Sequence, residues 1–243
     1  MCLLALGIRV SPEHPVIVLS HRDEFFARHA LPLHRWTEFD LVAGKDLKAQ
    51  GTWLAFGANG RFGALTNVPD HPPPIAAPSR GQLIVNFLKE QRSPAHAADP
   101  HVTQYAGFHL VVGEGDCVYL HSHPQSPQAI PLGPGIHILS NGPWGSAWPK
   151  QLAARQAFEH ALTRSLTTAV EWLTVLDDRC DRSAEDWDQS REDYQKRMFI
   201  KGPTYGTTAI TAALWSHTSR AWDIAEQRFD PMGIERERTL QRL

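Results

Sequence analysis

Apolar runs near the start of the chain predict two buried strands, at residues 2–10 and 15–20. Both runs are nearly continuous, which is typical of strands that are covered on both faces. A sheet with one face in water would instead alternate apolar and polar residues. The short polar stretch between the runs, residues 11–14, is suited to a turn. The pattern therefore predicts an antiparallel strand pair inside a layered fold.

Further apolar patterns predict the remaining elements. Strands are expected at residues 52–57, 61–67, 107–112, 116–121, 136–141, 205–215 and 221–229. Asn59-Gly60 favours a tight hairpin between the first two of these, because both residue types tolerate a positive φ. Helical spacing of apolar residues predicts helices at 80–91, 149–164 and 167–177. This order predicts an α+β fold in which antiparallel sheets carry helices on their outer faces.

Three segments are expected to lie at the periphery. Residues 68–78 contain five prolines and are predicted to form a surface loop. Residues 177–196 are dense in charge and are interpreted as an exposed connection. Residues 233–243 are interpreted as a charged tail. With no repeat or linker in the sequence, we predict a single domain over residues 1–243, with residues 229–243 as a peripheral tail.

Charge and hydropathy exclude several classes of partner. The net charge of −2 leaves no broad basic surface for nucleic acid. No apolar run is long enough to span a bilayer, and the N-terminus lacks the basic region of a signal peptide. We therefore expect the partner to be a small-molecule substrate or a hydrophobic ligand.

Cysteine and histidine usage bears on location and cofactors. The three cysteines, Cys2, Cys117 and Cys180, are sparse and odd in number, which indicates a reducing, cytoplasmic setting without a disulfide framework. His121-Ser122-His123 is the nearest approach to a metal motif, and no further ligand follows at a fixed spacing. We interpret these residues as polar groups at a strand end and expect no metal or other cofactor.

Cys2 is the first candidate for chemistry. Removal of Met1, which a small second residue permits, would leave a cysteine whose α-amine and thiol belong to one residue. An amine with an ordinary pKa of about 7.7–8.0 can accept the thiol proton, as in N-terminal threonine enzymes. The alternative is that Cys2 is a small apolar residue at the start of a buried strand.

A run of charged residues, His21-Arg22-Asp23-Glu24, follows the second predicted strand. Such runs are commonly solvated turns. However, antiparallel pairing would place the end of the second strand beside the start of the first, with Arg22 and Asp23 in reach of Cys2. A positive neighbour favours a thiolate and a carboxylate holds an ammonium group, so this pair would tune the nucleophile.

An ordered set of short motifs resembles one family along nearly the whole chain. The set consists of Met1-Cys2, Arg22-Asp23-Glu24, Gly51-Thr52-Trp53-Leu54, Leu65-Thr66-Asn67, Leu139-Ser140-Asn141 and Tyr205-Gly206-Thr207. On these motifs the chain is identified as a member of the NRDE family, also called the transport and Golgi organisation 2 family. The resemblance implies a four-layer αββα fold like that of the N-terminal nucleophile (Ntn) hydrolases, with distant similarity to bile-salt and penicillin V acylases.

The same resemblance implies a catalytic set. Cys2 would be the nucleophile, Arg22 and Asp23 its flanking pair, and Asn67 and Asn141 the donors that hold the oxyanion. Losing one oxyanion donor typically costs about 2.7–4 kcal/mol of transition-state stabilisation. Each asparagine taken alone is equally suited to a turn at a strand end.

Two positions depart from the family pattern, and both are candidates for contact with the substrate. His21 replaces the asparagine of the Asn-Arg-Asp-Glu signature, and Thr208 stands where the acylases carry a second arginine. Threonine cannot supply a positive charge, so Arg80 or Lys201 would have to do so. We assign Thr208, Trp144 and His21 as candidate substrate contacts.

Two functions remain open at this point. The first is an Ntn cysteine amidohydrolase or acyltransferase, in which Cys2 attacks a non-peptide amide or related acyl bond. The second is a non-catalytic protein that binds or traffics a small molecule such as haem or a lipid-like ligand, with Cys2 or a histidine as an axial haem ligand. Fold analogy alone does not decide between them.

Overall fold

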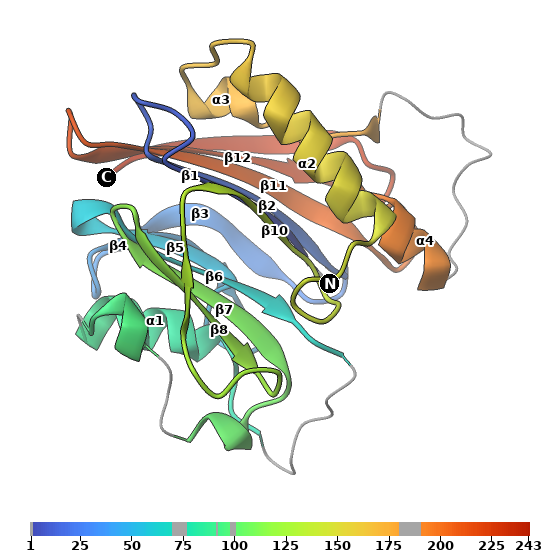
Figure 1. The fold of residues 1–243 in the computed structure, drawn as a ribbon. Coiled ribbons are helices and arrows are strands. Elements are labelled where there is room, and N and C mark those ends of the chain that lie inside the picture. The colour runs from blue at the N-terminus through green and yellow to red at the C-terminus, as the bar shows by residue number, and fades with distance from the viewer. Residues whose placement is uncertain (1, 70–76, 91, 98–100, 180–190) are drawn as a thin grey trace.

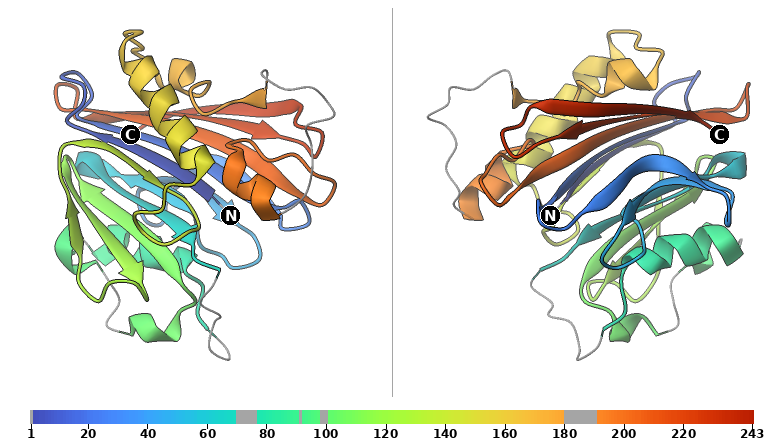
Figure 2. Two further views of the ribbon diagram at one scale, coloured as in Figure 1. Left: turned by 45° about the vertical axis from the view of Figure 1, so that its right-hand side comes forward. Right: turned by 180° about the vertical axis from the view of Figure 1, so that it is seen from behind.

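The computed structural model describes residues 2–69, 77–90, 92–97, 101–179 and 191–243. Two antiparallel sheets lie face to face, with helices on their outer faces (Figures 1 and 2). In the described residues the first sheet has the order β10 (Gly135–Leu139), β1 (Cys2–Ile8), β2 (Val16–Phe25), β11 (Tyr205–Ser216), β12 (Ala221–Phe229) and β13 (Glu235–Arg242). The second has the order β3 (Ala30–Trp36), β4 (Leu41–Asp46), β5 (Leu54–Gly57), β6 (Arg61–Asn67), β7 (Phe108–Glu114), β8 (Cys117–His123) and β9 (Ile130–Leu132).

Helices cover both outer faces of the sandwich. α2 (Pro149–Leu162), α3 (Ala169–Trp172) and α4 (Arg191–Lys196) lie on the side of the first sheet, and α1 (Gly81–Glu90) covers the second (Figure 1). Short 3₁₀ turns occur at Ala58–Gly60, Pro94–His96 and Val102–Gln104. The predicted α+β, four-layer αββα arrangement is confirmed.

The strands of the first sheet are apolar on both faces because each face meets a different core. In β1, Leu3 and Ala5 pack toward the helices, whereas Leu4 and Leu6 belong to the core between the sheets. This double burial explains the nearly continuous apolar runs. A third core lies between the second sheet and α1, and it includes Ile84 of that helix.

Several element boundaries differ from the sequence prediction. β2 continues through residues 21–25, so the charged run belongs to a strand and does not form a solvated turn. Residues 28–50, for which no element was predicted, contain β3 and β4. The helix predicted at 167–177 shortens to α3, with turns over residues 173–176. The predicted proline-rich loop and charged connection lie partly outside the described residues, at 70–76 and 180–190.

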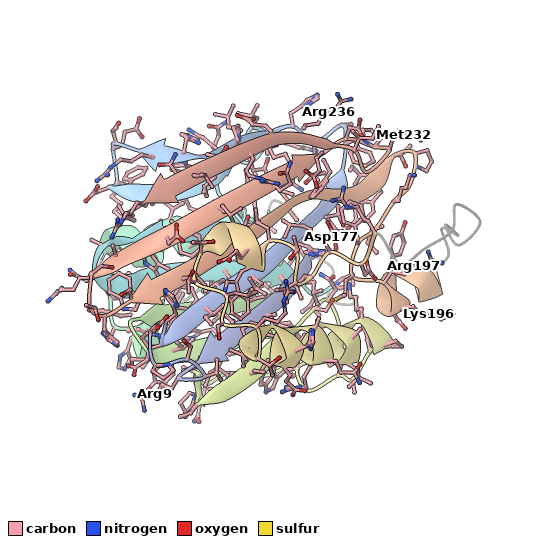
Figure 3. The ribbon with its side chains drawn as sticks, turned by 90° about the horizontal axis from the view of Figure 1, so that it is seen from above. Arg9, Asp177, Lys196, Arg197, Met232 and Arg236 are labelled. Carbon is pink, nitrogen blue, oxygen red and sulfur yellow. The ribbon has the colours of Figure 1, made fainter. Side chains whose placement is uncertain are left out.

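The prediction that residues 233–243 form a charged tail is wrong for most of these residues. Residues 235–242 form β13, which pairs with β12 at the edge of the first sheet. Met232 lies in the turn that joins these strands, and Arg236 lies near the start of β13 (Figure 3). The strand escaped prediction because an edge strand satisfies its backbone on one neighbour while its side chains, mostly charged, remain in water.

Candidate functional site

The candidate site begins at the pairing of β1 with β2. The two strands pair antiparallel as predicted, and the Cys2 backbone lies directly opposite Arg22. Met1 and the Cys2 side chain lie outside what the structure describes, so Cys2 is placed by its backbone alone. On the other side of β2, Asp23 lies opposite Thr207 of β11, and Arg22 lies opposite Ala209.

A β-bulge in β11 gives Arg22 and Asp23 one threonine each. The register shifts between Thr207 and Ala209, which leaves Thr208 as the extra residue. The Thr207 hydroxyl donates to Asp23 Oδ1 at 2.7 Å, while Arg22 Nη1 donates to the Thr208 hydroxyl at 3.0 Å. Consecutive threonines thus bind consecutive charged residues of the neighbouring strand.

Arg22 is only 6% exposed, and its guanidinium group makes several polar contacts. Besides Thr208, its Nη2 donates to the Arg28 carbonyl at 3.2 Å. The guanidinium lies 4.7 Å from the centre of the Trp53 ring, where the face of an indole attracts a cation. These contacts hold a buried positive group in one orientation at the end of β2.

The two predicted asparagines lie together at the ends of β6 and β10. Asn141 Nδ2 donates to the Asn67 backbone carbonyl at 2.7 Å, and the Thr66 hydroxyl donates to the Ser140 carbonyl at 2.9 Å. Asn141 is buried and Asn67 is half-buried. Because β6 and β10 belong to different sheets, these bonds join the sheets at the end of the sandwich where β1 starts.

A cavity of about 380 Å³ lies beside these groups. Arg22, Asp23 and Asn67 line it. Its other walls include charged and apolar side chains from the β2–β3 turn, the β4–β5 loop, β6 and the residues before α1, among them Arg28, Asp46, Lys48, Trp53, Leu65 and Arg80. Arg28 forms a 2.6 Å salt bridge with Asp46. The cavity therefore combines charged and apolar lining side chains, a combination suited to a small polar molecule that carries an apolar group.

Other predicted contacts lie away from this cavity or contribute indirectly. His21 lies among the residues that pack toward the helices, where its Nδ1 is 2.9 Å from the Met198 carbonyl and burial lowers its pKa. Trp144 packs half-buried against the core between the sheets. Of the two suggested replacement cations, Arg80 lines the cavity, and Lys201 is not among its described lining residues.

Several residues that share the site were not predicted from the sequence as its members. Thr207 and Trp53 appeared only as parts of longer motifs, although each contacts one of the predicted charged residues. Arg28 and Asp46 come from a stretch with no predicted element, so no sequence signal pointed to them. Among the described residues, no three histidine, cysteine or acidic side chains gather in a way that could hold a metal ion.

Glu226 is a buried acid that faces the core between the sheets. Its Oε1 accepts the Leu33 N–H at 2.9 Å, which joins β12 to β3. Burial raises the pKa of this carboxyl, and the Leu33 hydrogen bond and the positive charges of Arg228 and Arg22 oppose that rise only in part. The folded protein therefore retains a proton on Glu226 at pH values where the unfolded chain has lost it.

This proton sets a pH dependence. Stability from this group falls as the pH rises from the unfolded pKa, about 4.3, through the raised folded pKa, since the folded state binds more protons there. We expect Glu226→Gln, which keeps an acceptor for Leu33, to gain stability relative to the wild type over that range. Urea unfolding of both proteins at a series of pH values measures the difference. A difference that stays constant with pH would contradict the assignment.

The fold of the chain is found in a solved structure. A solved structure of an N-acylethanolamine-hydrolysing acid amidase orthologue from Caenorhabditis elegans superimposes with a TM-score of 0.54 over 88% of this chain and 92% of that chain, at 10% sequence identity. The two share the Ntn-hydrolase fold, an αββα sandwich.

The sequence comparison is more specific. The family model for transport and Golgi organisation 2 matches residues 1–231, and the chain belongs to that family. The mouse homologue is 27% identical and the human homologue 28% identical, each over 88% of this chain and 88% of the relative. The Drosophila melanogaster protein is 36% identical over 36% of this chain and 35% of its own length. In the described residues, no helix has the length and apolar character needed to cross a membrane.

Proposed function

We propose that the protein is an N-terminal nucleophile hydrolase or acyltransferase that acts on a non-peptide amide or related acyl bond. The observation that carries the proposal is the register of β1 on β2, which sets the Cys2 backbone opposite a buried arginine that lines a 380 Å³ cavity.

The reaction would begin after removal of Met1. The freed α-amine of Cys2 takes the thiol proton, and the thiolate attacks the acyl carbon. The carbonyl π electrons move to oxygen, which Asn141 and Asn67 would stabilise as an oxyanion. Collapse of this intermediate breaks the bond to the leaving group, which takes the proton from the amine.

The second half of the reaction would release the acyl group. Water attacks the thioester carbon while the same α-amine accepts a proton from it. The thioester C–S bond breaks, the carboxylic acid leaves, and the thiol regains its proton. In this proposal Arg22 supplies positive charge near the sulfur and Asp23 holds the ammonium form of the amine.

The residue departures fit a modified version of this site. Thr208 does not supply a second positive charge, but its hydroxyl accepts from Arg22 Nη1 and donates to the Arg22 carbonyl at 3.0 Å. In this proposal Arg80, which lines the cavity, supplies the missing charge toward the substrate. The sparse cysteines indicate a reducing, cytoplasmic setting, which would keep the Cys2 thiol free.

The test is mass spectrometry of the purified protein before and after incubation with a panel of N-acyl amides and thioesters. We expect the mature chain to lack Met1 and to gain one acyl group that hydroxylamine removes. Trypsin should place that group on the peptide from Cys2 to Arg9. A retained Met1, or an acyl group carried only by Cys117, would contradict the proposal. Saturable binding without any adduct would favour the non-catalytic binding function.

A further inference from the structure

The turn that follows β10 is attached to the second sheet at three consecutive residues. The Thr66 hydroxyl donates to the Ser140 carbonyl at 2.9 Å, Asn141 Nδ2 donates to the Asn67 carbonyl at 2.7 Å, and His109 Nε2 lies 2.8 Å from the Gly142 carbonyl. Thr66 and His109 face each other across β6 and β7. Two residues of β6 and one residue of β7 thus hold residues 140–142 of the turn.

The bond from His109 determines the state of its ring. A carbonyl oxygen only accepts hydrogen bonds, so Nε2 carries the proton and Nδ1 is an acceptor. Nδ1 lies 2.9 Å from the hydroxyl of Ser122, which is the direct partner of His109 across β7 and β8 and is able to donate to it. Both residues are buried, and burial lowers the pKa of His109, which favours the neutral ring that this arrangement requires.

The Trp148 ring also packs against this turn. A Cβ atom at Gly142 would come within 2.7 Å of the Trp148 ring, so the peptide lies directly against that side chain. Gly142 is thus in contact with Trp148 at its α-carbon and with His109 at its carbonyl oxygen. Asn141 is the preceding residue, and its position depends on the same contacts.

We infer that His109 and Ser122 are positioning residues that orient Asn141 through the Gly142 carbonyl. The inference rests on the proposed function where it concerns catalysis, because Asn141 is there a donor to the oxyanion. Ser122 orients the imidazole, the imidazole holds the peptide, and the peptide sets the amide of Asn141. Neither residue contacts the reacting atoms in this arrangement.

The chain provides a matched control for the test. His121 is also a buried histidine of the second sheet, its Nε2 lies 2.8 Å from the Pro94 carbonyl, and burial lowers its pKa too. Its carbonyl partner belongs to a 3₁₀ turn at Pro94–His96 and not to the turn of Asn141. His109→Leu and His121→Leu therefore remove equivalent bonds, of which one reaches the proposed site.

The catalytic readout compares two reactions of Cys2. Acylation uses the oxyanion donors, whereas alkylation by iodoacetamide forms no oxyanion and reports general access to the thiol. In His109→Leu we expect acylation to slow by about 10–100-fold, part of the effect of losing a donor outright. Alkylation should change by about twofold or less, because the variant alters an interaction that only the transition state of acylation uses. His109→Gln, whose amide can occupy the Nε2 position, should recover most of the rate, and Ser122→Ala should show a smaller loss.

A structural readout separates this inference from the proposed function. Backbone amide exchange in residues 140–146 should be faster in His109→Leu and Ser122→Ala than in the wild type, and unchanged in His121→Leu. Unchanged exchange in both His109→Leu and Ser122→Ala would overturn the positioning role. If the wild type itself is never acylated, the proposed function fails and exchange alone decides the positioning role. If the wild type is acylated and His109→Leu has the same ratio of acylation rate to alkylation rate, the proposed contribution of His109 to catalysis is overturned.

Discussion

Replacing Cys2 by alanine is expected to reduce acyl-bond cleavage to the level without enzyme. Removing the nucleophile of a well-studied serine protease costs about 10⁶-fold in kcat, and a loss on that order is expected here. The variant keeps the α-amine of residue 2 and the pairing of β1 with Arg22, so it removes only the sulfur. Steady-state turnover of the best substrate from the panel, together with the mass of the incubated protein, measures the result.

Cys117→Ala is the matched control for that variant. Cys117 is an exposed free cysteine in β8, in the sheet that does not contain β1. Turnover should be unchanged when it is replaced. Turnover in Cys2→Ala that equals the wild type would sink the nucleophile assignment. A loss shared equally by both variants would mean that the substrate reacts with exposed thiols in general.

Replacing Trp222 by alanine is expected to lower the free energy of unfolding by about 3–5 kcal/mol, the usual cost of removing a large buried aromatic side chain. Trp222 is fully buried in the core between the sheets. Its ring centre lies 4.9 Å from that of Phe56, 5.4 Å from Trp215 and 5.8 Å from Phe62. Phe56 and Phe62 come from the second sheet, so the loss removes contacts that hold the two sheets together.

Urea unfolding with an unchanged m-value measures this loss. Trp222→Phe should lose less, because it keeps an aromatic ring and because Trp222 Nε1 has no hydrogen-bond partner among the described residues. Leu240→Ala is the surface control: Leu240 is 59% exposed on β13, and its replacement should change stability by no more than about 0.5 kcal/mol. A loss below about 1 kcal/mol in Trp222→Ala would contradict the role of this cluster.

Local patterns predicted much of the framework correctly because they report burial. The runs at residues 2–10 and 15–20 are apolar on both faces, and the strands they form meet a different core on each side. Asn59 and Gly60 both adopt a positive φ, as the hairpin prediction required. By contrast, β3 is half-exposed and mixed in sequence, and β4 has only four buried residues before its polar end, so what makes them strands is pairing with neighbours.

The candidate site was predictable only as a set of residue types. Sequence order and pairing rules predict that Arg22 and Asp23 lie near Cys2, and the structure adds the register that sets the Cys2 backbone opposite Arg22. The bulge at Thr208 could not be predicted, because it depends on how β11 is paired along its whole length. His109 and Ser122 are separated by 13 positions, and nothing local relates them to the turn at Gly142.

The sequence by itself determined the layered antiparallel framework, the family and the chemical types available at the head of β1. Only the tertiary structure decided which of those groups share a cavity, since that depends on how two sheets are stacked and which turns meet at their ends. Hydrophobic periodicity is a local property that each strand carries in its own residues. The orientation of Arg22, Asp23 and Asn141 is not set locally alone, because each makes a hydrogen bond with a residue at least 74 positions away in the chain.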